Sequence, residues 1–109
     1  IWAMDVARYG AWANRPYTNA KVRENYSRRF RIRFPNEELE AARPLRTTPI
    51  YDRLRDENAV FGDYCTLEHA LWFAPRGTSA VEHATFRRSN AHAHVAAECR
   101  AVREGCGLI

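Results

Sequence analysis

The fold is decided by residues 60–73, which read VFGDYCTLEHALWF. Residues 60–64 are rich in side chains that favour strands, and they predict a strand, either regular or with a bulge at Gly62. Residues 66–73 predict a second strand. Its alternation places one apolar-rich set on a single face, namely Leu67, His69, Leu71 and Phe73. We expect both strands to belong to a small antiparallel sheet.

A third strand is predicted over residues 29–34, because the sequence RFRIRF alternates strictly until Pro35 ends it. The apolar side chains of this strand should face a core, and its arginines should face the other side. Together with the other elements, it gives a predicted core that consists of Phe30, Ile32, Phe34, Leu54, Phe61, Leu71 and Phe73.

Helices complete a predicted α+β fold. Besides a short helix within residues 1–15, three segments have helical patterns, over about 20–28, 49–57 and 95–104. Their ends carry suitable residues: Thr18 or Asn19 as the first cap, Thr48 and Pro49 before the second helix, and Gly105 after the third. The other segments predict a loop over 41–47, a turn over 75–78 and a linker over 78–94.

The composition is that of an ordinary globular chain of 109 residues, with 46% hydrophobic and 28% charged residues. It excludes disordered, collagen-like and low-complexity classes. No apolar run approaches the roughly 20 residues of a membrane span, so we expect no membrane partner. The net charge of +4 is too small to favour nucleic acid by itself. We read both ends, at Ile1 and Ile109, as cuts and expect a piece of a longer protein.

The cysteines are Cys65, Cys99 and Cys106, and an odd number argues against a disulfide scaffold. We expect reduced, buried thiols, which are typical of a cytosol or an organelle matrix.

Three groupings of arginine or histidine residues could bind a ligand or a metal ion. Arg29, Arg31 and Arg33 could grip nucleic-acid phosphates, or could simply form a solvated strand face or ion pairs with another domain. His92 and His94, with His83 and Cys99 nearby, could hold zinc, or could be surface histidines. Arg87 or Arg88 could clamp a carboxylate, or could belong to an interdomain tether.

No grouping completes an active site. His69 is expected to be a core histidine with its hydrogen bonds satisfied, rather than a catalytic base. We therefore assign no catalytic, cofactor-binding or metal-binding residue in this chain.

Six sequence blocks are a more specific guide to the protein family than these groupings. They are YTNAKVRENY (17–26), RIRFPNEE (31–38), RPLRTTPIY (43–51), LEHALWF (67–73), FRRSN (86–90) and the end from Glu98 to Ile109. In this order they resemble the segment that follows the flavin domain in the FAD-dependent dimethylglycine and sarcosine dehydrogenase family. Ala93-His94 departs from the Glu-Pro of family members, which weakens the zinc hypothesis.

The resemblance implies a fragment of a larger multidomain flavoenzyme. Residues 1–15 would be the tail of the FAD-binding domain, 16–76 the central connecting domain, and 77–109 a linker and the start of a folate domain like the glycine-cleavage T-protein. The parent would oxidise a small N-methyl amino acid with FAD and pass the one-carbon unit to tetrahydrofolate. FAD would bind outside this segment, and the segment would be a scaffold without activity of its own.

The partners implied are the flanking FAD and folate domains and the N-methyl substrate, without nucleic acid. The compartment implied is the cytoplasm of a bacterium or the mitochondrial matrix of a eukaryote. The alternative hypothesis is a small basic nucleic-acid-binding module that uses the Arg29/Arg31/Arg33 face.

Overall fold

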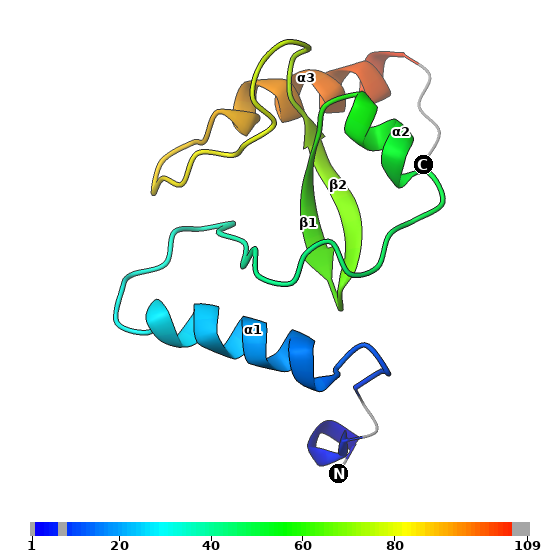
Figure 1. Ribbon diagram of the computed structural model, residues 1–109. Helices are drawn as coiled ribbons and strands as arrows, with labels where there is room; N and C mark the ends of the chain where they lie inside the picture. The colour runs from blue at the N-terminus through cyan, green and yellow to red at the C-terminus, as the bar shows by residue number, and fades with distance from the viewer. Residues whose placement is uncertain (1, 7–8, 106–109) are drawn as a thin grey trace.

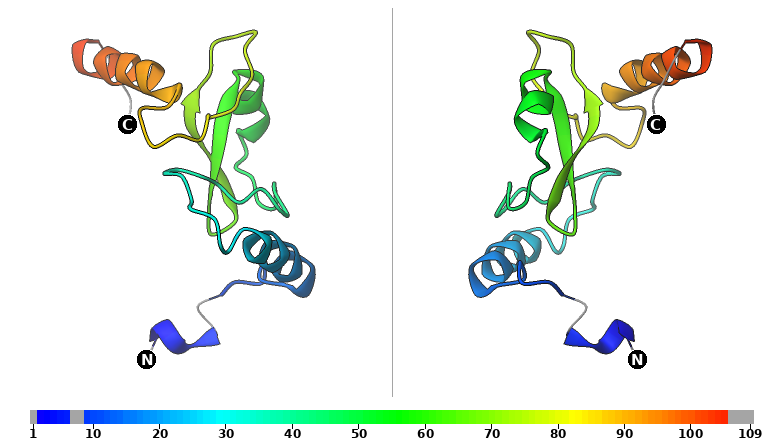
Figure 2. Two further views of the ribbon diagram at one scale, coloured as in Figure 1. Left: turned by 90° about the vertical axis from the view of Figure 1, so that its left-hand side faces the viewer. Right: turned by 90° about the vertical axis from the view of Figure 1, so that its right-hand side faces the viewer.

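The computed structural model describes residues 2–6 and 9–105, and their architecture is α+β as predicted (Figure 1). The elements in chain order are η1 (Trp2–Met4), α1 (Arg15–Ser27), α2 (Tyr51–Asp56), β1 (Ala59–Tyr64), β2 (Leu67–Phe73) and α3 (Ala91–Glu104). The two strands form one antiparallel hairpin. Helices α1 and α3 lie beyond opposite ends of this hairpin, and α2 and α3 lie on opposite sides of it (Figure 2).

The hairpin turns at Cys65 and Thr66, whose φ angles are 48° and 71°. Two successive residues with positive φ match the twist of the flanking strands, so a two-residue connection suffices. The pairing shifts once: Val60 pairs with Trp72, but Phe61 pairs with Ala70. The irregularity therefore leaves Leu71 of β2 without a partner, so the strand is neither regular nor bulged at Gly62, the two alternatives that the sequence allowed.

The predicted inward face of β2 is wrong. Glu68 and Trp72 are each only 3% exposed, whereas His69, Leu71 and Phe73 are exposed and Leu67 is half-buried. Alternation defines two faces but does not say which one is covered. Here a large indole and a paired carboxylate are on the covered face.

The core is small and surrounds the hairpin. Its buried apolar residues are Ala59, Val60, Trp72, Ala74 and Ala91. Of the predicted core residues, only Phe34, Leu54 and Phe61 are even half-buried. The Phe61 ring packs on Tyr51 of α2 with the ring centroids 4.6 Å apart, which attaches this short helix to the sheet.

Helix α1 begins about five residues earlier than predicted, at Arg15. Its cap is Asn14, whose side-chain oxygen accepts a hydrogen bond from the Tyr17 backbone N–H at 3.0 Å, rather than Thr18 or Asn19. Pro16, which precedes the helix predicted over 20–28, occupies the first turn of α1, where its missing N–H costs nothing.

The strand predicted over residues 29–34 does not form. The end of α1 instead unwinds through successive turns, in which the backbone N–H groups of Arg28, Arg29 and Arg31 donate to carbonyls three residues earlier. The predicted core residues Phe30 and Ile32 are 91% and 77% exposed. The strict alternation does not produce a strand here, because no strand among the described residues pairs with this segment.

The other helices form close to their predicted positions. Helix α2 starts at Tyr51, whose N–H donates to the Thr48 carbonyl. Helix α3 starts at Ala91, four residues before the prediction, because buried Ala91 packs against the core and His94 of the first turn stacks on the buried Trp72. It ends at Gly105 as expected. The turn over 75–78 is confirmed by the Thr78 N–H, which donates to the Pro75 carbonyl.

Asn58 joins α2, β1 and the chain after β2. Its side-chain amide donates to the carbonyls of Ala74, Pro75 and Thr78.

Among the described residues, no helix combines the length and apolar character required to cross a bilayer.

Candidate functional site

A buried ion pair links the loop before α2 to the hairpin. The Arg43 guanidinium donates from Nε to Oε1 of Glu68 at 2.8 Å and from Nη2 to Oε2 at 2.6 Å. Nη2 also donates to the Phe61 carbonyl at 3.0 Å, and Nη1 lies 3.5 Å from Oε2 of Glu38. The hydrogen bond to Glu68 raises the pKa of Arg43 despite its burial. The pair is a structural connection, since both groups are fully engaged by the protein itself.

Little in the sequence indicates this pair. Arg43 stands in a segment that predicts a loop, and Glu68 falls on the strand face opposite the predicted core residues Leu71 and Phe73. The useful signal would have been a single carboxylate between apolar neighbours on a strand. The Arg43 loop also runs beside β2: Arg46 forms an isolated bridge with Leu67, and the Glu68 N–H donates to the Arg46 carbonyl.

A second acidic group fixes the loop to α1. The Glu24 carboxylate accepts hydrogen bonds from the backbone N–H groups of Glu40 and Ala41, at 3.0 and 2.8 Å, and lies 3.0 Å from Nη2 of Arg28. Burial opposes its ionisation, but these N–H groups and the nearby charges of Arg28 and Lys21 outweigh it. The pKa of Glu24 is therefore lowered from its ordinary value.

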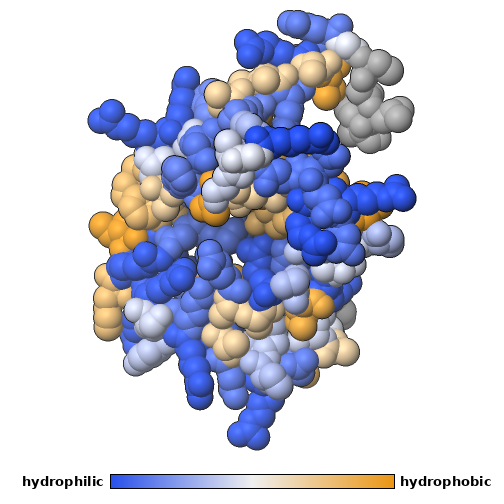
Figure 3. Space-filling model, turned by 45° about the horizontal axis from the view of Figure 1, so that its top comes forward, coloured by the Kyte–Doolittle hydropathy of each residue, from blue (hydrophilic) through white to orange (hydrophobic). Residues whose placement is uncertain are grey.

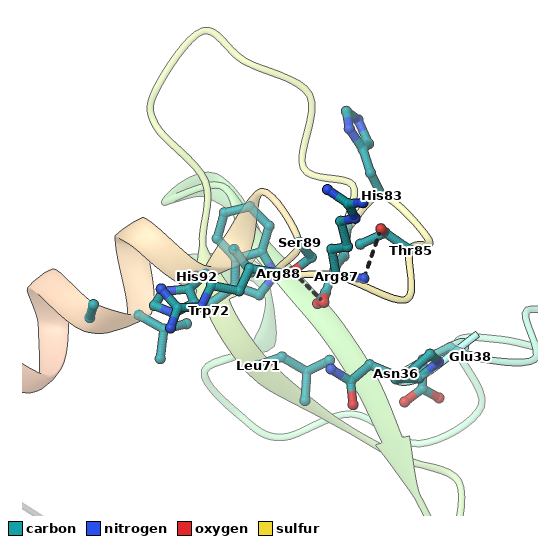
Figure 4. A pocket seen from close by; sticks show the side chains of 15 residues that line it. Asn36, Glu38, Leu71, Trp72, His83, Thr85, Arg87, Arg88, Ser89 and His92 are labelled. Carbon is teal, nitrogen blue, oxygen red and sulfur yellow. Dashed lines mark hydrogen bonds between the residues drawn. The ribbon is translucent and has the colours of Figure 1, made fainter.

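An open groove of about 580 Å³ lies where β2, the start of α3 and the 82–89 loop meet (Figure 4). Its apolar wall comes from Leu71, Trp72 and Val95. Its polar residues are Asn36, Glu38, Glu82, His83, Thr85, Arg87, Arg88, Ser89 and His92. The groove brings together residues of two predicted groupings, Arg87 and Arg88 from one and His83 and His92 from the other.

Hydrogen bonds join the two ends of the 82–89 loop, which lines this groove. The Ser89 hydroxyl donates to Oε1 of Glu82 at 2.8 Å. The Asn90 side chain accepts from the His83 N–H and donates to the Val81 carbonyl. Phe86, farther out in the loop, packs on Phe34 with the ring centroids 4.6 Å apart. The arginines between these attachments are thus placed by a constrained loop rather than by an extended tether.

The arginines of residues 29–33 do not form a strand face. Arg31 pairs with Glu37, and Arg33 donates to the Asn25 side chain. Arg29 lies over the rings of Tyr26 and Phe30, at 4.9 and 4.8 Å from their centroids. Local partners therefore take up these cations, and the arrangement lends no support to the nucleic-acid alternative.

The histidine grouping is not a metal site in this structure. His92 and His94 lie on a helix, where side chains two apart point to different sides, rather than on a strand face. His94 stacks on Trp72, with the ring centroids 5.6 Å apart. Within residues 2–6 and 9–105, no three histidine, cysteine, aspartate or glutamate side chains gather around a possible ion.

Two further expectations about single residues are corrected. His69 is exposed, because β2 presents it to the uncovered side, and it is not a core histidine. Cys65 and Cys99 are free and exposed rather than buried, one in the hairpin turn and one on the outer side of α3. Cys106 lies outside the described residues.

Comparison with known proteins identifies the class of protein to which this chain is similar. Residues 1–48 match the family model described as the FAD dependent oxidoreductase central domain. The match contains the blocks at 17–26 and 31–38, so it agrees with the resemblance to the dimethylglycine and sarcosine dehydrogenase family over the first part of the chain.

Individual relatives are similar along most of the chain. This chain is 36% identical over 107 residues to 4-methylaminobutanoate oxidase (formaldehyde-forming) of Paenarthrobacter nicotinovorans, and the alignment covers 97% of this chain and 13% of that protein. It is 33% identical over 102 residues to mitochondrial dimethylglycine dehydrogenase of Homo sapiens, covering 93% and 12% respectively. Mitochondrial sarcosine dehydrogenase of Homo sapiens is 33% identical over 58 residues, covering 53% and 6%. The chain thus spans about an eighth of the curated relatives' length.

Proposed function

We propose that this chain is part of a FAD-dependent oxidoreductase that removes a methyl group from a small N-methyl amino acid. The single observation that carries the proposal is the 36% identity to 4-methylaminobutanoate oxidase over 97% of this chain. Dimethylglycine and sarcosine dehydrogenases among the relatives support the same substrate class. Within this class we propose that tetrahydrofolate accepts the one-carbon unit, and that the protein works in the bacterial cytoplasm or the mitochondrial matrix.

The described residues do not fit the nucleotide part of FAD. A dinucleotide cofactor is usually bound at the glycine-rich turn of a parallel βαβ unit. The sheet here is a single antiparallel hairpin with a two-residue turn. We therefore assign FAD and tetrahydrofolate to other parts of the whole protein and assign no catalytic step to residues of this chain.

The role proposed for the chain itself is that of a scaffold between domains. Residues 1–15 would complete the FAD domain, 16–76 would form the connection, and 77–109 would lead into the folate domain. Large apolar side chains are exposed on several elements, including Met4, Val6, Phe30, Ile32, Phe86 and Val102. Figure 3 shows apolar patches separated by hydrophilic residues on the face in view.

Phe30 and Ile32 are the clearest part of this interface. They belong to a segment whose backbone is fixed through Glu37, which accepts from both Arg31 and the Phe34 N–H. A well-anchored loop that exposes two large apolar side chains is suited to packing against another domain. We propose that the flanking FAD domain covers them, since the relatives have ample chain for such a domain.

The catalytic part of the proposal is tested on the purified full-length gene product. We expect a bound flavin absorbance that bleaches anaerobically with sarcosine, dimethylglycine or 4-methylaminobutanoate, and release of formaldehyde that tetrahydrofolate suppresses. A protein without flavin, or one unchanged by all three compounds, would contradict the catalytic proposal. Unsuppressed formaldehyde would remove the folate step alone.

The scaffold role is tested separately with Phe30→Ser/Ile32→Ser in the same protein. We expect faster proteolytic cleavage between the domains and release of flavin at a lower temperature. Tyr64→Ser, which changes an exposed apolar side chain at the hairpin turn, serves as the control. Equal behaviour of parent and double variant would argue against packing of Phe30 and Ile32 on the FAD domain.

A further inference from the structure

We propose that the groove between β2, the start of α3 and the 82–89 loop is a binding site for a small organic anion. The ligand class is a carboxylate attached to a flat apolar body, with the carboxylate at Arg87 and Arg88 and the body against the apolar wall of Leu71, Trp72 and Val95 (Figure 4). This site is distinct from the proposed N-methyl substrate chemistry and does not rest on it.

The charge balance of the groove favours an anion. Its two acidic residues are already engaged, Glu38 with Arg43 and Glu82 with the Ser89 hydroxyl. Within the described residues, no carboxylate pairs with the guanidinium group of Arg87 or Arg88. A guanidinium group that faces a groove without a carboxylate partner is well suited to a bidentate contact with a ligand carboxylate.

The shape and the loop support the same ligand class. A volume of about 580 Å³ is in the range of sites for small molecules. The bonds from Ser89 and Asn90 hold the loop ends, so little ordering would be required when a ligand binds. The first turn of the 14-residue helix α3 also lines the groove, and its dipole adds positive potential there.

The apolar wall carries one unused hydrogen-bond donor. Trp72 is 3% exposed, and its indole Nε1–H is buried without an acceptor among the described residues. A buried donor without a partner carries a desolvation cost that a ligand acceptor could relieve after a small shift of the covering side chains. A flat ligand with a second polar group would therefore fit better than a purely aliphatic carboxylate.

The test uses terephthalate as the probe, titrated calorimetrically into the full-length gene product. We expect saturable binding with one site, and no binding of the neutral analogue terephthalamide. Arg87→Gln/Arg88→Gln should weaken binding at least tenfold, because both charged contacts are lost. The matched control Arg53→Gln/Arg100→Gln removes the same charge from exposed helix positions and should change binding less than twofold.

A second measurement needs no variant. Phenylglyoxal modifies accessible guanidinium groups, and peptide mapping reports each arginine separately. We expect terephthalate to slow modification of Arg87 and Arg88 while Arg53 reacts at an unchanged rate. Absence of binding, equal weakening in both double variants, or equal protection of all three arginines would each overturn the proposal.

Discussion

Strand β2 of the hairpin and the 29–34 segment have similar sequence patterns but adopt different structures. Both alternate apolar and polar residues, yet β2 pairs with β1 while residues 29–34 form a turn followed by an irregular segment. In β2 the buried face carries Glu68 and Trp72, whereas in the other segment Phe30 and Ile32 are exposed. The difference shows that alternation marks two faces, and that the neighbours decide whether a strand forms and which face is covered.

The largest expected effect comes from breaking the buried pair of the hairpin. Glu68→Ala leaves the Arg43 guanidinium buried without its carboxylate, which should cost about 3–5 kcal/mol of unfolding free energy. Urea unfolding of the 1–109 chain, followed by circular dichroism, measures this loss. A chain of this size could be fully unfolded by such a change, and that outcome would also agree with the prediction.

The control is Glu57→Ala. Glu57 pairs with Arg76 at 2.6 Å, but their side chains are 58% and 79% exposed. Exposed pairs contribute at most about 1 kcal/mol, so this variant should stay close to the parent. Similar losses for Glu57→Ala and Glu68→Ala would mean that burial does not distinguish the two pairs.

A smaller effect is expected where β1 approaches Leu71. A Cβ atom on Gly62 would lie 3.0 Å from both Leu71 methyl carbons and 3.1 Å from Oε1 of Glu38. Gly62→Ala should therefore destabilise the chain by about 1–3 kcal/mol through overpacking. In Leu71→Ala/Gly62→Ala the crowding against Leu71 is relieved and only the Glu38 contact remains, so the double variant should lose less than the sum of the single losses. Strict additivity would contradict close packing at this position.

The Glu24 contact should contribute about 1 kcal/mol, and its contribution should depend on pH. The folded-state pKa of Glu24 lies below its ordinary value of 4.5, so its stabilisation is complete above pH 4.5. It is lost as the pH falls through the folded-state pKa, because protonation removes the charge that the N–H groups and Arg28 stabilise. Glu24→Gln should thus be less stable than the parent at pH 7, and the two should converge in acid.

Unfolding curves between pH 2.5 and pH 7 measure this convergence. Glu104→Gln, in the exposed last turn of α3, is the control and should give a difference that is nearly constant across the range. A constant difference for Glu24→Gln as well would show that the carboxylate of Glu24 is not held in its charged form.

What the sequence could predict depended on whether the signal was local. The turn at 75–78, the end of α3 at Gly105 and the two hairpin strands were all predicted because Gly, Pro and strand-forming residues act on their own neighbourhood. The start of α1 was missed because Asn14 and Pro16 permit a helix there without demanding one. The Arg43–Glu68 pair and the groove residues were not grouped, because they come together only through long-range packing.

The smallest effect is expected where the pattern was most misleading. Phe30→Ser/Ile32→Ser should change the unfolding free energy of the 1–109 chain by less than about 0.5 kcal/mol, because both side chains already face solvent. A paired strand with a buried apolar face would instead lose about 2–5 kcal/mol for each truncated side chain. Urea unfolding distinguishes these outcomes directly. A large loss in the isolated chain would restore the predicted strand and remove the exposed surface on which the scaffold role depends.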